Sequence, residues 1–252
     1  MIDIFDVTLP ALTGAETRRA YVYLPEAAGD GDRRFPVLYM FDGHNVFFDE
    51  DATYGKSWGL GEYLDAFEVP LIVAAVECNH GEDNARLKEY APYSFSALGF
   101  GSIEGRGPRT MDWLVHVFKP GIDRDYPTLP DREHTFIAGS SMGGLMTLFA
   151  LAAYGDTFSR GAALSPSVDF SPEDVKRMVR GARWRDKVLY MDMGSAEMSR
   201  KSRSVYGEVT SLLIRRSAQV ESRIIPGGVH SEASWERQIP FFLDTLFYEL
   251  EI

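Results

Sequence analysis

The stretch FIAGSSMGGLMTLFALAAYG, from Phe136 to Gly155, decides the fold. It holds two adjacent serines between glycines, with a short apolar run before them and a longer one after them. The first run, TFIA, is β-like, and the second, LMTLFALAA, is apolar nearly all round, as is typical of a helix buried against a sheet. The stretch therefore predicts a strand, a tight turn at the serines and a buried helix.

The turn matches a motif that carries chemistry. Ser141 is the centre of G-x-S-x-G at Gly139-Ser140-Ser141-Met142-Gly143. Between a strand and a helix, this pattern holds a nucleophilic serine on a sharp, strained turn, and the glycines remove side chains where the two elements meet. A purely structural glycine turn is the alternative. The flanking runs favour Ser141 as a nucleophile, with the Met142 N–H at the helix N-terminus as an oxyanion donor.

The rest of the chain alternates short apolar runs with longer amphipathic ones, which indicates an α/β fold with a mostly parallel sheet and helices on both faces. The predicted strands lie at 18–25, 36–42, 71–77, 135–140, 161–167, 187–193 and 221–227. The predicted helices lie at 58–67, 111–123, 142–154 and 234–250. Segment 79–110 is rich in Gly, Ser and charge, and it predicts a long irregular loop, either a binding loop or a solvated one. No second core is visible, so one domain over residues 1–252 is predicted.

Composition narrows the function classes. The net charge of −11 argues against nucleic acid or an anionic membrane as a partner. Cys78 is the only cysteine, which excludes an intramolecular disulfide and a cysteine-based metal site, and its apolar neighbours suggest a packing role for the thiol. No apolar run approaches the ~20 residues that cross a bilayer, and the N-terminal residues lack a signal-peptide pattern. A cytoplasmic location is therefore expected.

A nucleophilic serine needs a histidine base and an acid that orients it, and on this fold they follow in the order serine, acid, histidine. Of five histidines, only His230 follows Ser141, in a Gly-Gly loop just before the last predicted helix. The run KVLYMDMGSAEM offers two carboxylates. Glu197 lies beyond Gly194, at the carboxyl end of the predicted strand, and is favoured as the acid. Asp192, inside the run, is the alternative.

A second oxyanion donor is expected in the loop after an early central strand. In PVLYMFDGHNVF, Gly43 lets the backbone turn, so the N–H of His44 can face the serine while its side chain lines the cleft. The other histidines, His80, His116 and His134, do not pair at a metal-ligand spacing along the chain. The sequence therefore predicts no metal site and no cofactor.

Together these residues resemble the Putative esterase branch of the α/β-hydrolases, which includes esterase D and enterochelin-esterase-like proteins. The resemblance rests on PVLYMFDGHNVF, RLKEYAPYS, FKPGIDRDYPTLPDREHTFIAGSSMGGL, MDMGSAE and GGVHSEASW. It implies the triad Ser141, Glu197 and His230, with oxyanion amides at Met142 and His44. It also implies that Arg86 and Glu89 organise the long loop, that Trp58 borders an acyl pocket, and that Trp235 anchors the last helix.

The expected activity is that of a serine carboxylesterase that forms an acyl-enzyme and needs no cofactor. Its expected substrates are small-molecule or carbohydrate-linked esters, including acetyl and feruloyl esters. Tyr90 and Tyr93, in the long loop, suit an aromatic acyl group, although they equally suit packing of the loop. An acyltransferase and a non-catalytic binding module are the alternatives. A catecholate–iron substrate is disfavoured by the acidic charge and by the single domain. The oligomeric state is not readable from the sequence.

Overall fold

The computed structural model describes residues 1–29, 31 and 33–251. Its main sheet has eight strands in the order β1-β2-β4-β3-β7-β8-β9-β10. β1 and β2 pair antiparallel, as do β2 and β4, whereas every neighbouring pair from β4 to β10 is parallel. The predicted mostly parallel α/β sheet is confirmed. The strands are β1 Ile2–Thr8, β2 Thr17–Tyr23, β3 Val37–Met40, β4 Ile72–Val76, β7 Thr135–Ser140, β8 Arg160–Leu164, β9 Val188–Gly194 and β10 Gln219–Ile225.

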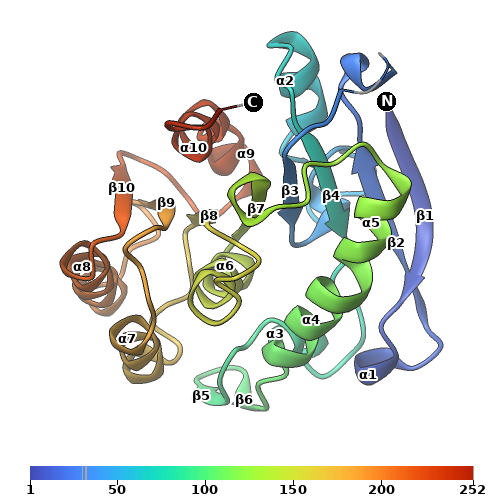
Figure 1. The fold of residues 1–252 in the computed structure, drawn as a ribbon. Coiled ribbons are helices and arrows are strands. Elements are labelled where there is room, and N and C mark those ends of the chain that lie inside the picture. The colour runs from blue at the N-terminus through green and yellow to red at the C-terminus, as the bar shows by residue number, and fades with distance from the viewer. Residues whose placement is uncertain (30, 32, 252) are drawn as a thin grey trace.

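Helices cover both faces of this sheet (Figure 1). One face carries α2 Leu60–Ala66, α9 Glu232–Glu236 and α10 Ile239–Leu246. The other carries α4 Gly107–Trp113, α5 Lys119–Asp125, α6 Met142–Ala153, α7 Pro172–Gly181 and α8 Arg200–Arg215. The shorter elements are α1 Pro10–Thr13, α3 Ala85–Glu89, the 3₁₀ turns η1 Glu26–Gly29, η2 Gly43–Asn45 and η4 Arg132–His134, and the π-helical turn η3 Leu114–Phe118.

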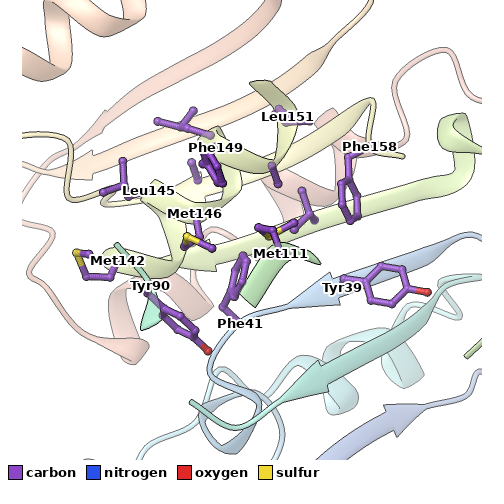
Figure 2. Packing of buried hydrophobic residues seen from close by; sticks show 14 of the residues in the cluster. Tyr39, Phe41, Tyr90, Met111, Met142, Leu145, Met146, Phe149, Leu151 and Phe158 are labelled. Carbon is purple, nitrogen blue, oxygen red and sulfur yellow. The ribbon is translucent and has the colours of Figure 1, made fainter. Parts of the chain in front are cut away.

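Two layers of core result, one on each face. On β3, Tyr39 faces the layer beneath α4 to α8, and Leu38 faces the layer beneath α2 and α10, because successive strand side chains point to opposite faces. Figure 2 shows the first layer, in which the rings of Tyr39 and Phe158 pack edge to face with centroids 6.2 Å apart. Burying one large apolar side chain contributes about 1.5–3 kcal/mol, so both layers stabilise the sheet strongly.

Several elements differ from the sequence-based expectation. Segment 79–110 is not wholly irregular, because it contains α3, the start of α4 and a hairpin of β5 Phe95–Ala97 and β6 Gly101–Ile103. The helix expected at 234–250 is two helices, α9 and α10, with Pro240 in the first turn of α10. β1, α7 and α8 were not predicted. That the chain forms one domain remains a prediction. The eight-stranded sheet does include strands from both ends of the chain, from β1 to β10.

None of the helices in the described residues is both long enough and apolar enough to cross a membrane.

The close approach of β7 and α6 makes Gly139 sensitive to substitution. A Cβ on Gly139 would lie 2.8 Å from the backbone carbon of Gly143, whereas a Cβ on Gly121, in α5, meets nothing within 4 Å. We expect Gly139→Ala to lower the free energy of unfolding by about 1–3 kcal/mol, since overpacking forces the backbone to shift. Gly121→Ala should be neutral or slightly stabilising. Urea unfolding of the two variants measures the contrast, and equal stabilities would show that the turn is loosely packed.

Candidate active site

Ser141 occupies a strained position between β7 and α6. Its backbone has φ 58° and ψ −119°, a conformation that residues with a Cβ rarely adopt. Three backbone hydrogen bonds hold it there. The Ser141 N–H donates to Leu164 O at 2.9 Å, and Ser141 O accepts from the Ser167 N–H at 3.0 Å and from the Leu145 N–H at 3.1 Å. Strain that is held by its surroundings in this way is a feature of functional sites.

The hydroxyl of Ser141 meets a second serine. Its Oγ lies 3.3 Å from the Oγ of Ser167, and among the described residues no hydrogen bond joins it to His230. Catalytic hydrogen bonds are often long in unliganded enzymes and tighten when substrate binds, so this geometry does not remove His230 from consideration. Ser167 was not predicted. Its only signal in the sequence is the run Ser-Pro-Ser after the β8 pattern.

Glu197 and His230 form a direct pair. Glu197 Oε2 is hydrogen-bonded to His230 Nδ1. Its other oxygen, Oε1, accepts from the Ser165 hydroxyl at 2.6 Å and from the Gly194 N–H at 2.7 Å. Burial by itself would raise the pKa of Glu197, but the hydrogen bonds from His230, Ser165 and Gly194 outweigh it and hold the pKa below its usual value. The carboxylate is therefore charged at neutral pH and faces one specific histidine nitrogen.

A short chain of side chains supports this pair. Trp235 Nε1 donates to the Ser165 hydroxyl at 3.0 Å, and that hydroxyl donates to Glu197. The Trp235 ring also packs edge to face against the His230 imidazole, with centroids 5.0 Å apart. Trp235 thus fixes both members of the pair, which is more than the helix anchor expected from the sequence. Ser165, whose φ is 42°, was not predicted at all.

Asp192 lies elsewhere in the same network. It is 1% exposed, and its Oδ1 accepts from the Ser165 N–H at 3.0 Å while its Oδ2 accepts from the Tyr190 hydroxyl at 3.1 Å. Burial raises its pKa to about 7, and the two hydrogen bonds only partly offset this. Asp192 therefore holds the Ser165 turn from inside the sheet, and the carboxylate that contacts His230 is Glu197.

The turn after β3 lies at the same edge of the sheet, because β3 and β7 are parallel neighbours. It begins at Asp42, which has φ 57°, and continues as η2. Arg86 holds this turn with two hydrogen bonds. Its Nε donates to Asp42 Oδ1 at 2.6 Å, and its Nη2 donates to Asp42 Oδ2 at 2.7 Å. Such two-pronged Arg–carboxylate pairs restrict geometry strongly, so the backbone that carries the His44 N–H is well ordered. The Asp42 carboxyl keeps a lowered pKa, because the nearby Arg86 charge outweighs the effect of burial.

Arg86 and Glu89, which were both expected to organise the long loop, contact different parts of the fold. Arg86 organises the Asp42 turn, whereas Glu89 is buried and pairs with Arg18, at the start of β2. Both contacts join α3 to other parts of the fold. They give a physical reason for the ordered course of segment 79–110.

Three sequence-based expectations for the cleft are corrected by burial. The His44 side chain is 3% exposed and bonds Thr53 Oγ1 through Nε2, so it does not line a cleft. Trp58 is 2% exposed between Trp235 and Phe242, in the core. Tyr90 is also 2% exposed, packs against Phe41 (Figure 2), and accepts from the Asp42 N–H at 3.2 Å through its hydroxyl. Side chains this deeply buried present almost no surface to a substrate in this conformation.

Tyr93 differs from Tyr90 because it is only half-buried. Its ring packs edge to face against Phe149 in α6, with centroids 6.2 Å apart. Nearby in the chain, Phe95 of β5 stacks on Phe170 with an interplanar angle of 7°, and Phe100 meets the same ring edge-on. The hairpin therefore brings a group of aromatic side chains against the segment that follows Ser167.

Comparison with known proteins places this geometry in a family. Residues 13–243 match the family described as Putative esterase. The chain is 24% identical to the uncharacterized protein YbbA of Bacillus subtilis over 185 residues, 73% of this chain and 70% of that one. It is 23% identical over 251 residues to an endo-1,4-beta-xylanase/feruloyl esterase of Xylanibacter ruminicola, covering 97% of this chain but only 31% of that longer protein.

The solved structures agree on the fold. An IroE-like serine hydrolase from Shewanella oneidensis superposes with a TM-score of 0.74 at 18% sequence identity, over 98% of this chain and 78% of that one. The parallel strands, the serine turn after β7 and the match over residues 13–243 lead to one conclusion. This chain belongs to the Putative esterase family and is an ester hydrolase with the α/β-hydrolase fold.

Proposed function

We propose that this protein is a serine carboxylesterase in which Ser141, His230 and Glu197 form the catalytic triad. The observation that carries the proposal is the pairing of His230 Nδ1 with the charged Glu197 at the sheet edge that also holds the strained Ser141 turn. A carboxylate on Nδ1 keeps the proton there, which leaves Nε2 free to accept one from a serine hydroxyl.

The reaction then follows from these positions. Ser141 Oγ attacks the ester carbonyl carbon while its proton passes to His230 Nε2, and Glu197 stabilises the imidazolium that forms. The backbone N–H groups of Met142 and His44 donate to the oxyanion, each contributing about 3 kcal/mol of barrier lowering. The tetrahedral intermediate collapses, the alkoxide leaves with the proton from His230, and the acyl group stays on Ser141. Water, activated by His230, releases the carboxylic acid.

For the substrate, we propose a small-molecule or carbohydrate-linked ester, with feruloyl and acetyl esters as the two classes to compare. The feruloyl class is supported by the half-buried Tyr93 and by the aromatic group of Phe95, Phe100 and Phe170, since flat acyl groups pack well on such rings. It is also supported by the feruloyl esterase in the description of the Xylanibacter relative.

Labelling with a fluorophosphonate tests whether the serine is activated. The reagent should add once to the folded wild-type protein, and peptide mapping should place the adduct on Ser141. An adduct on Ser140 or Ser167, or no adduct on well-folded protein, would contradict the assigned nucleophile. Initial rates on matched methyl ferulate and aryl acetate substrates then decide the acyl class, and an aromatic preference should appear as a higher kcat/KM for the ferulate.

A further inference from the structure

His44, Cys78 and His80 come together in the structure, although His44 lies far from the other two in the sequence. One ligand atom from each of the three lies within 4.8 Å of the others. The reason is topological: β3 and β4 are parallel neighbours, so η2, which follows β3, and the segment after β4 leave the sheet at the same edge. A Cβ on Gly43 would lie 2.9 Å from backbone atoms of Ala75 and Val76, which shows how closely the two segments pack.

The atoms in this cluster are metal ligands in their chemistry. Two imidazoles and one thiol are a ligand set that suits Zn²⁺ and related thiophilic cations. From the sequence, the single cysteine excludes a cysteine-based site, and the spacing of the histidines predicts no metal site. Spacing along the chain does not by itself decide the question, because neighbouring strands bring the three residues together.

A second observation that points to a ligand is a buried ring nitrogen of His44 that makes no hydrogen bond within the described residues. The His44 side chain is 3% exposed, its Nε2 lies 3.0 Å from Thr53 Oγ1, and its Nδ1 has no hydrogen-bond partner among the residues described. A buried polar atom without a partner is costly and calls for an explanation. Metal-binding histidines typically donate their second N–H to a fixed acceptor, and in the tautomer with the proton on Nε2 His44 donates to Thr53 in this way. Nδ1 is then the nitrogen left for a ligand.

The ligand atoms lie within 4.8 Å of one another, which is close to the spacing of a tetrahedral site. In a tetrahedral Zn²⁺ site, ligand atoms lie roughly 3.3–3.8 Å from one another, given Zn–N of about 2.0 Å and Zn–S of about 2.3 Å. The buried residues, His44 and Cys78, are held by the core, whereas His80 is exposed and its ring already meets that of His44 edge-on, with centroids 4.6 Å apart. Movement of the exposed His80 can therefore bring a third protein ligand to the cation, and water would take the fourth tetrahedral position.

We propose that His44, Cys78 and His80 form a binding site for one thiophilic divalent cation of the Zn²⁺ class. Cys78 binds as the thiolate after its proton is released to solvent, and both histidines bind as neutral imidazoles. The cation links the turn that carries the His44 N–H to the segment after β4. The inference stands on the cluster itself and is independent of the proposed triad.

Calorimetric titration of the EDTA-treated, tag-free protein with ZnSO₄ tests the site. The wild-type chain should bind one Zn²⁺. Cys78→Ser and His80→Asn should each weaken binding by at least about tenfold, because even partners outside the ligand set change metal affinity by about 10–100-fold. Co²⁺ should give a thiolate-to-metal charge-transfer band in wild type that disappears in Cys78→Ser.

The control is His116→Asn, which changes a histidine in η3, outside the cluster, and should leave Zn²⁺ binding unchanged. Because Cys78 is buried, circular dichroism first checks that Cys78→Ser folds, and the exposed His80→Asn gives a second, structurally mild test. The proposal fails if wild type binds no Zn²⁺ at one per chain, or if His80→Asn and folded Cys78→Ser bind it as tightly as wild type.

Discussion

Replacing Ser141 with alanine is expected to lower kcat/KM on every ester substrate by about 10⁴-fold or more, because removal of a triad serine leaves only binding and the oxyanion donors to act. The thermal midpoint should change little. The substitution keeps the Cβ at φ 58° and the backbone hydrogen bonds to Leu164 and Ser167, and it removes only a 3.3 Å contact with Ser167 Oγ. Steady-state kinetics and thermal unfolding on the same preparation measure both effects.

Ser140→Ala is the matched control for this variant. Ser140 is the adjacent residue, ends β7 and is 7% exposed, so its substitution perturbs the same turn without touching the proposed nucleophile. It should keep most of the wild-type kcat/KM. Full activity in folded Ser141→Ala, or equal losses in the two variants, would show that the chemistry does not depend on the Ser141 hydroxyl.

Residues whose roles depend on local pattern could be predicted from the sequence. The strand–turn–helix around Ser141 is such a case, since glycine, apolar run and serine all lie within one short stretch. The contact between Glu197 and His230 could also be anticipated, because parallel strands such as β9 and β10 end at one edge of the sheet. Their catalytic roles, like that of Ser141, remain proposals.

Residues whose roles depend on packing between distant segments could not be predicted. Ser165 and Trp235 are 70 positions apart, and their hydrogen bond exists only because α9 packs over the end of β8. The buried state of Trp58 has the same origin, since its neighbours Trp235 and Phe242 come from the far end of the chain. The sequence alone does not distinguish an aromatic residue that lines a pocket from one that packs in a core, because the difference depends on which residues contact it.

The second large effect is expected for Glu197→Gln, with a fall in kcat of about 10⁴-fold, by analogy with the carboxylate-to-amide change in other serine triads. The reason is the tautomer. If the amide oxygen keeps the hydrogen bonds from Ser165 and Gly194, its NH₂ group faces His230 Nδ1. Nδ1 must then accept, the imidazole proton moves to Nε2, and His230 can no longer take the proton of Ser141.

Asp192→Asn is the control that separates the two carboxylates. Its oxygen can still accept from the Ser165 N–H, and because the pKa of Asp192 is raised to about 7, the wild-type residue is itself partly neutral near that pH. We therefore expect kcat within about tenfold of wild type for Asp192→Asn, as for a group that positions a turn without touching the histidine. Burst kinetics with a chromogenic ester would show the acylation step slowed in Glu197→Gln alone. A large loss in Asp192→Asn together with a small one in Glu197→Gln would reverse the assignment, because the acid that controls the His230 tautomer would then be the buried carboxylate inside β9.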